Sequence, residues 1–190
     1  MREHGIVRRI AIVYRETAAR LLAAPADVDA MALGEAAGLV RTFIEDYHEA
    51  RLEEQHVFPA VRQAGGEAAA LVDVLLAQHK RGRAITEFVR DKCRAGRIAA
   101  GDAQPLARAL ESFVRMYDAH AAYEDTIVFQ AWKRSMSMRQ LREAGERFEE
   151  IEHRVFRGDG FDIALDQVAA IERRLGLHAL GRFTAPPPVG

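Results

Sequence analysis

Histidine and glutamate residues that fall on apolar helix faces are the groups of this sequence best able to do chemistry, and His120 is the clearest case. On a helical wheel, His120 and Glu124 lie within about 60° of the apolar residues of their own segment. Those apolar residues are Leu106, Phe113, Tyr117, Ile127 and Ala131. A buried glutamate is costly unless it is paired or coordinates a cation. The pattern therefore predicts a metal-binding His–Glu pair or, without a metal, a buried His–Glu hydrogen bond. Asp125 falls off this face and is expected to be dispensable for metal binding.

Two further histidines lie on apolar stripes of other segments. His79 is in line with Val72, Leu75, Gly82, Thr86, Val89 and Cys93, and Arg83 lies at the edge of that stripe. His4 shares its face with Val7, Ala11, Ala18 and Leu22. A single histidine among apolar residues is usually a hydrogen-bonded core residue. Neither histidine alone predicts a metal site.

His48 lies at the edge of an apolar stripe whose phase breaks down farther along the chain. The stripe consists of Leu33, Ala37, Val40, Ile44 and Tyr47. A regular continuation would bury Arg51 and expose Glu53, which is an unfavourable arrangement for an arginine. A π-bulge between His48 and Glu53 would turn Glu53 inward, and such bulges are frequent at functional sites. We therefore predict an irregular turn here, with Glu49 as the alternative carboxylate if the helix stays regular.

Taken together, the inward histidines favour a metal centre. His4, His48, His79 and His120 fall on four consecutive helical segments, and two of them are followed by a glutamate. Imidazole and carboxylate ligands together suit iron, with manganese and zinc as alternatives. Two carboxylates that can bridge indicate two ions rather than one.

A competing pattern is the Glu-x-x-His spacing of ferritin-like bundles, which occurs at Glu53–His56 and Glu150–His153. On a helical wheel, however, His153 shares its face with charged residues, while Phe148, Ile151 and Val155 point the other way. We therefore expect His153 to lie on a solvated face, and the ferritin-like pairing fails. We then expect His56 either to contact a ligand without binding metal itself or to lie on the surface. His178 is expected to be exposed.

The elements that must position these residues are all predicted to be helical. Apolar residues recur at intervals of three and four and nowhere alternate over the length of a strand. This spacing predicts helices at roughly 3–23, 29–58, 66–94, 103–134, 138–156 and 161–174. Gly65-Gly66 is a helix stop and Asp102 a candidate N-cap. The short connections make consecutive helices antiparallel neighbours.

Composition limits the classes of function. The chain has 190 residues, 49% apolar and 29% charged, with a net charge of −1. It offers no basic stripe for nucleic acid or an anionic membrane. No run of about 18 apolar residues is present, so no membrane span is expected. Cys93 is the only cysteine, which excludes an intramolecular disulfide. The N-terminal residues lack a signal peptide, so we expect a cytoplasmic protein, or an exported one whose signal was removed.

Four segments carry a resemblance to a known family. They are Arg2–Gly5, Phe43–Pro59, Gln78–Gly82 and His120–Phe129. These segments resemble the hemerythrin-like cation-binding proteins, which have a His-His-Glu (HHE) pattern. The resemblance implies an all-α, up-down-up-down four-helix bundle over residues 1–135. It also implies a C-terminal helical extension over 136–182 and leaves a Pro-rich tail over 183–190. We expect the extension to pack on the same domain, because no Ser/Gly-rich linker precedes it.

The same resemblance implies a site with two iron ions, bridged by two carboxylates and by an oxo or hydroxo group. His4, His48, His79 and His120 correspond to nitrogen ligands, and Glu53 and Glu124 to bridging carboxylates. Oxygen-carrying members have a fifth histidine where this chain has Arg83, and an Asp where it has Glu124. Water, Glu49 or Tyr123 are the candidates to fill the position left by Arg83. These departures count against reversible oxygen carriage more than against iron binding.

Two functions stay open. The first is a non-catalytic di-iron module that binds oxygen, senses iron or redox state, or stores metal. The second is a redox enzyme that acts on peroxide, oxygen or nitric oxide, so whether the protein is an enzyme is undecided. The sequence disfavours a metal-free interaction bundle, and it does not specify the oligomeric state.

Overall fold

The computed structural model describes residues 2–188, and every regular element in that part of the chain is a helix. The expected all-α class is confirmed. The long segments are α1 (Glu3–Ala23), α2 (Ala30–Leu39), the π-helix η2 (Val40–Val57), α3 (Phe58–Ala64), α4 (Gly66–Cys93), α5 (Ala103–Tyr123), the π-helical turn η4 (Glu124–Val128), α6 (Phe129–Arg134), α7 (Met138–Phe156) and α8 (Gly160–Leu175). Short 3₁₀ turns occur at Pro25–Asp27, Ala100–Asp102 and Leu180–Phe183. No described helix is long and apolar enough to cross a membrane.

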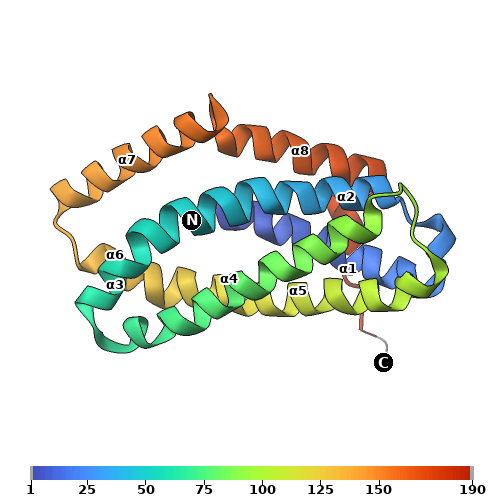
Figure 1. Cartoon of the computed structure of the whole chain (residues 1–190), viewed down its shortest axis with the longest axis horizontal. Coiled ribbons are helices and arrows are strands. Elements are labelled where there is room, and N and C mark those ends of the chain that lie inside the picture. The colour runs from blue at the N-terminus through green and yellow to red at the C-terminus, as the bar shows by residue number, and fades with distance from the viewer. Residues whose placement is uncertain (1, 189–190) are drawn as a thin grey trace.

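Several of these helices join end to end into continuous rods. The segments α2, η2 and α3 form one rod, α5, η4 and α6 form another, and α1 and α4 are single helices. Figure 1 shows the rods lying side by side along the long axis, with consecutive rods running in opposite directions. The helices α7 and α8 lie along the outer side of the rod formed by α2 and η2 (Figure 1). The histidine-bearing segments therefore face a common interior.

The interior has two apolar clusters. The larger one joins α1, α2, η2, α5 and α8 through fully buried residues such as Ile10, Leu33 and Val168. The smaller one joins α3, α4, η4 and α6, and Phe58, Val72 and Phe129 are among its members. Burial of these side chains supplies the main driving force for bringing the rods together.

One expected helix end is wrong, and one expected cap lacks its side-chain hydrogen bond. The second rod does not end at residue 58 but continues through Pro59 to Ala64. Proline is tolerated here because it occupies the first turn of α3, where a missing N–H is least costly. The rod ends at Gly65, whose φ of 75° is in the left-handed region. Asp102 does precede α5, but its side chain makes no capping bond and instead lies 2.9 Å from Nζ of Lys92.

The two C-terminal helices differ in how firmly they are packed. The helix α8 begins at Asp159, which caps it, and buries Ala164, Val168 and Ile171 against the main core. The helix α7 begins with a capping box between Ser137 and Gln140 but buries only one residue, Glu152. Thr184–Pro188 form no regular element and are exposed, while residues 189–190 of the expected tail, like Met1, lie outside the described residues.

Candidate metal centre

All six residues expected to bind metal are brought together in the interior of the bundle. His4 lies in the first turn of α1, His48 and Glu53 lie in η2, and His79 lies in α4. His120 is near the end of α5, and Glu124 begins η4. Each of the six is at most 4% exposed. Their ligand atoms form two groups that share Glu53. These groups are His4, His48 and Glu53, and Glu53, His79, His120 and Glu124.

The two oxygens of Glu53 face different histidines. Oε1 lies 3.1 Å from Nε2 of His48, and Oε2 lies 3.4 Å from Nε2 of His79. A carboxylate in this position can bind one ion through each oxygen. It therefore has the placement of a bridging ligand.

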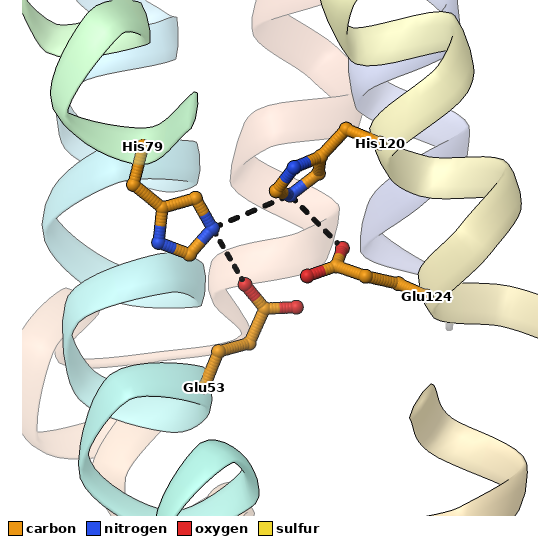
Figure 2. Close-up of side chains that lie close together, drawn as sticks. All are labelled: Glu53, His79, His120 and Glu124. Atoms are coloured by element: carbon orange, nitrogen blue, oxygen red, sulfur yellow. Dashed lines mark hydrogen bonds and ion pairs between the residues drawn. The ribbon is translucent and has the colours of Figure 1, made fainter. Parts of the chain in front are cut away.

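Glu124 lies between the other two histidines. Its Oε2 atom is 3.1 Å from Nε2 of His120 and 3.4 Å from Nε2 of His4. The Nε2 atoms of His79 and His120 are 3.3 Å apart, and Figure 2 shows both rings pointing toward the space between the carboxylates. The histidines thus form two pairs, His4 with His48 and His79 with His120, and the glutamates lie between the pairs.

A π-helical backbone turns both glutamates inward. The expected irregular turn between His48 and Glu53 is confirmed, although the π-helix is longer than a single bulge and spans Val40–Val57. Arg51 is exposed, as the phase argument required. A second π-helical turn, not anticipated from the sequence, begins at Glu124. The carbonyls of Glu53 and Glu124 each accept from the N–H five residues ahead, so both carboxylates sit where the helix is widened.

Three of the histidines are oriented by polar side chains behind them. In each case Nδ1 makes a hydrogen bond and Nε2 faces the centre. The Nδ1 partners are Oδ1 of Asp125 for His4 at 3.1 Å, Oε1 of Glu54 for His79 at 2.9 Å, and Oε1 of Gln78 for His120 at 2.9 Å. Such partners fix the ring and its tautomer and commonly support metal ligands.

The partner of His4 corrects the sequence-based expectation that Asp125 is unconnected to the site. Asp125 is indeed off the apolar stripe, and its side chain is 26% exposed. It nevertheless reaches His4 because α1 packs along α5, which places the residue next to Glu124 against the start of α1. Glu54 and Gln78 likewise follow or precede a ligand by one residue, and adjacency of this kind is the only sequence signal they offer.

The buried polar atoms of the centre have few partners within the protein. Both oxygens of Glu53, both oxygens of Glu124 and both ring nitrogens of His48 are buried without a hydrogen bond. Leaving such groups unsatisfied costs about 1–3 kcal/mol each, and more when they are charged. A metal cation would satisfy them, so the residues present fit a metal centre.

In the metal-free centre, the pKa values of the histidines and glutamates are shifted in different directions. Burial lowers the pKa of His79, but the carboxylates of Glu53 and Glu54 outweigh it and raise that pKa to about 10. Burial and the neighbouring His79 lower the pKa of His120 to about 4. Burial and the charge of Glu53 raise the pKa of Glu124 to about 7. Protonated histidine therefore balances carboxylate charge where a metal ion would otherwise do so.

Arg83 lies on the Nδ1 side of His79 and forms ion pairs with two carboxylates. Its Nη2 atom is 2.7 Å from Oε1 of Glu54 and 3.1 Å from Oε2 of Glu49. The hydroxyl of Tyr117 donates to Oε1 of Glu49 at 2.5 Å. Glu49 is 3.9 Å from Nδ1 of His79, on the side of the ring that faces away from Glu53. In this structure Glu49 therefore belongs to the layer behind the centre.

The remaining candidates are not in the cluster. Tyr123, considered as an additional ligand, is 52% exposed, so its ring lies largely in solvent. His153 and His178 are exposed, as expected. His56 is partly buried and packs against Phe148, with ring centroids 5.8 Å apart.

Comparison with known proteins gives one family and three close relatives. Residues 1–132 match the model of the hemerythrin HHE cation-binding domain. The chain is 44% identical over 188 residues to an uncharacterized protein of Mycobacterium bovis and to uncharacterized proteins of two Mycobacterium tuberculosis strains. Each match covers 97% of this chain and 71% of the relative. No solved structure matches the chain.

Proposed function

The chain belongs to the hemerythrin HHE cation-binding domain family, and we propose that it holds two iron ions in a non-haem di-iron centre. His4 and His48 bind one ion, and His79 and His120 bind the other. Glu53 and Glu124 bridge the two. The observation that carries the proposal is the placement of Glu53, whose oxygens face His48 at 3.1 Å and His79 at 3.4 Å and have no other partner.

Iron is the metal that this donor set suits best. Four imidazoles and two carboxylates combine nitrogen and oxygen donors, which iron accepts readily, with manganese and zinc as alternatives. When bound, an iron pair supplies electron-transfer chemistry toward oxygen, peroxide or nitric oxide. The protein's own residues orient the ligands through Asp125, Glu54 and Gln78, and keep bulk water out by burial.

The function proposed is that of a non-catalytic module that binds oxygen or that senses or stores iron or redox state. Arg83 takes the place of the fifth histidine of oxygen-carrying members, and its guanidinium is engaged by Glu49 and Glu54. The alternative is a redox enzyme. A mainly apolar pocket of about 160 Å³, lined by Leu71, Leu75 and Gln78, lies beside His120 on the side of its Nδ1 atom.

The architecture that we propose for this function is the up-down-up-down bundle over residues 1–135. The extension over 136–182 packs on the same domain, and 183–190 form a tail. The opposed directions of consecutive rods (Figure 1) and the contacts of α8 with α1 and α2 support this division.

The experiment that tests the function is metal analysis of protein expressed with iron and purified without chelators, with optical spectra before and after reduction. We expect about two irons per chain and a spectrum that changes on reduction. Protein without bound transition metal would overturn the proposal. Spectral recovery in air without turnover supports oxygen binding or redox sensing, whereas catalytic consumption of peroxide or nitric oxide supports the enzyme.

A further inference from the structure

The first turn of α1 carries His4 and has an acidic residue, Glu3, but no side-chain cap. Arg2 is the N-cap residue, and no side chain caps the turn. The first N–H groups of a helix have no partner within the helix, and helix ends fray. A ligand in this turn therefore depends on tertiary contacts for its position.

The C-terminal extension supplies such a contact at Arg2. The guanidinium of Arg2 donates to both carboxylate oxygens of Glu152 in α7, at 3.3 and 3.1 Å. It also lies 3.8 Å from Asp159 and stacks over the ring of Phe161, 4.6 Å from its centroid. Residues at the turn between α7 and α8 thus contact Arg2, the residue that precedes α1.

Glu152 is built into the extension as a fixed anchor. It is the one buried residue of α7, with 6% exposed. Its Oε1 atom also accepts from the backbone N–H of Phe161 at 2.8 Å. Hydrogen bonds to a charged, buried carboxylate are stronger than those between neutral groups. Glu152 is thus held by its burial and by Phe161, whereas the side chain of Arg2 is 50% exposed.

Aromatic side chains pack beside this anchor, where the ring centroid of Phe156 lies 5.8 Å from that of Phe43 and 5.1 Å from that of Tyr47. A cavity of about 390 Å³ lies between the extension and the α2–η2 rod, lined by residues that include Phe43, Phe156 and Ile163. Ile163 is 40% exposed at its edge. The contacts of Arg2 with Glu152, Asp159 and Phe161 join the α7–α8 turn to the residue before α1.

We propose that the C-terminal extension acts as a clamp on the metal centre, in which Glu152 holds Arg2 and so keeps the first turn of α1, and His4 with it, in ligand position. Glu152 is a positioning residue that touches no metal. Opening of the clamp would release His4 first and so set the rate at which metal leaves. The inference rests on the proposed function, because His4 is a ligand only if the centre binds metal.

A matched control exists on the same extension. Glu172 in α8 is 8% exposed and forms a bidentate ion pair with Arg9 of α1. It resembles Glu152 in burial, partner and location on the extension. Arg9, however, lies more than one helical turn beyond His4, in a part of α1 held by Ile10 and Val13.

The test compares iron release from the parent protein, Glu152→Gln and Glu172→Gln, each loaded with Fe(II) anaerobically and mixed with an excess of a chromogenic ferrous chelator. We expect iron release from Glu152→Gln to be about tenfold faster than from the parent. Losing the charged hydrogen bonds to Arg2 would make opening of the first turn easier by about 1.4 kcal/mol, which corresponds to a factor of about ten. Release from Glu172→Gln should stay near the parent rate even if its melting temperature falls. Equal rates in Glu152→Gln and the parent, or equal acceleration in both variants, would overturn the clamp.

Hydrogen–deuterium exchange of the metal-free proteins provides a second readout. Amides of residues 5–7, the first in α1 with backbone acceptors, should exchange faster in Glu152→Gln than in the parent and Glu172→Gln. If the parent binds no metal, the proposed function fails, while this comparison still decides whether the extension holds the turn. Arg2→Gln, which removes a side chain that is 50% exposed, replaces Glu152→Gln if that variant does not fold.

Discussion

Oδ1 of Asp125 lies 3.1 Å from Nδ1 of His4, on the opposite side of the imidazole from the nitrogen that faces Glu124. The same carboxylate binds Arg8 through its other oxygen at 2.8 Å. Asp125 thus links α1 to the π-helical turn that carries Glu124, and it fixes the direction in which His4 presents Nε2.

We predict that Asp125→Ala weakens iron binding by about 10–100-fold, the usual effect of removing a residue that orients a metal ligand. The imidazole of His4 would lose the acceptor that holds its ring. Iron affinity measured by competition with a chelator checks this. His153→Ala changes an exposed histidine and should keep the parent affinity. Unchanged affinity in Asp125→Ala would show that burial alone orients His4.

His120→Ala and Glu124→Ala should each abolish binding of at least one iron. His120 supplies a nitrogen to one ion, and Glu124 lies between His120 and His4. Elemental analysis of the purified variants measures the loss, with circular dichroism as a check on folding. Retention of the full iron content by folded Glu124→Ala would exclude it as a bridging ligand.

The position at Arg83 should leave the iron near His79 open to an added anion. Arg83 supplies no ligand, because its guanidinium is bound to Glu49 and Glu54. We expect azide to bind the oxidised, iron-loaded protein and add a charge-transfer band. Arg83→His should weaken that binding by completing the coordination. An iron-loaded protein that does not bind azide would indicate that another group occupies the position.

Glu45 makes folding stability depend on pH. Burial raises the pKa of Glu45 from 4.5 to about 7, against the opposing effects of the Thr86 hydroxyl and Arg41. Between these values the folded protein keeps a proton that the unfolded chain has released, so stability falls as pH rises from about 4.5 to 7. The effect is on the order of 1–3 kcal/mol.

Glu45→Gln removes this titration. The variant should gain stability relative to the parent as pH rises from 4.5 to 7, and the difference should be constant above that range. Urea unfolding of both metal-free proteins across this pH range measures it. A stability difference that does not change with pH would mean that Glu45 is ionised throughout.

The site was predictable where a polar residue falls on the apolar face of a predicted helix. His120, Glu124 and His79 were found in this way. Glu53 was found because a regular helix would have buried Arg51, which the structure leaves exposed. The signal in these cases is the cost of burying a charge, which can be read from one helix alone.

What escaped prediction depends on contacts between helices. Glu54 and Asp125 look like ordinary surface carboxylates on their own helices, and only the packing of α4 and α1 brings histidines to them. Pro59 suggested a helix end because proline usually breaks the interior of a helix, but here it begins a new segment. The ion pair between Glu152 and Arg2 joins residues 150 positions apart, so no local sequence pattern predicts it.

The most direct test of a two-iron centre is anomalous X-ray scattering at the iron edge from crystals of the iron-loaded protein. We predict two peaks about 3.5–4 Å apart, one beside His4 and His48 and the other beside His79 and His120, with Glu53 and Glu124 between them. A single peak, or a peak on the side of His79 that faces Glu49 and Glu54, would contradict the bridged di-iron centre.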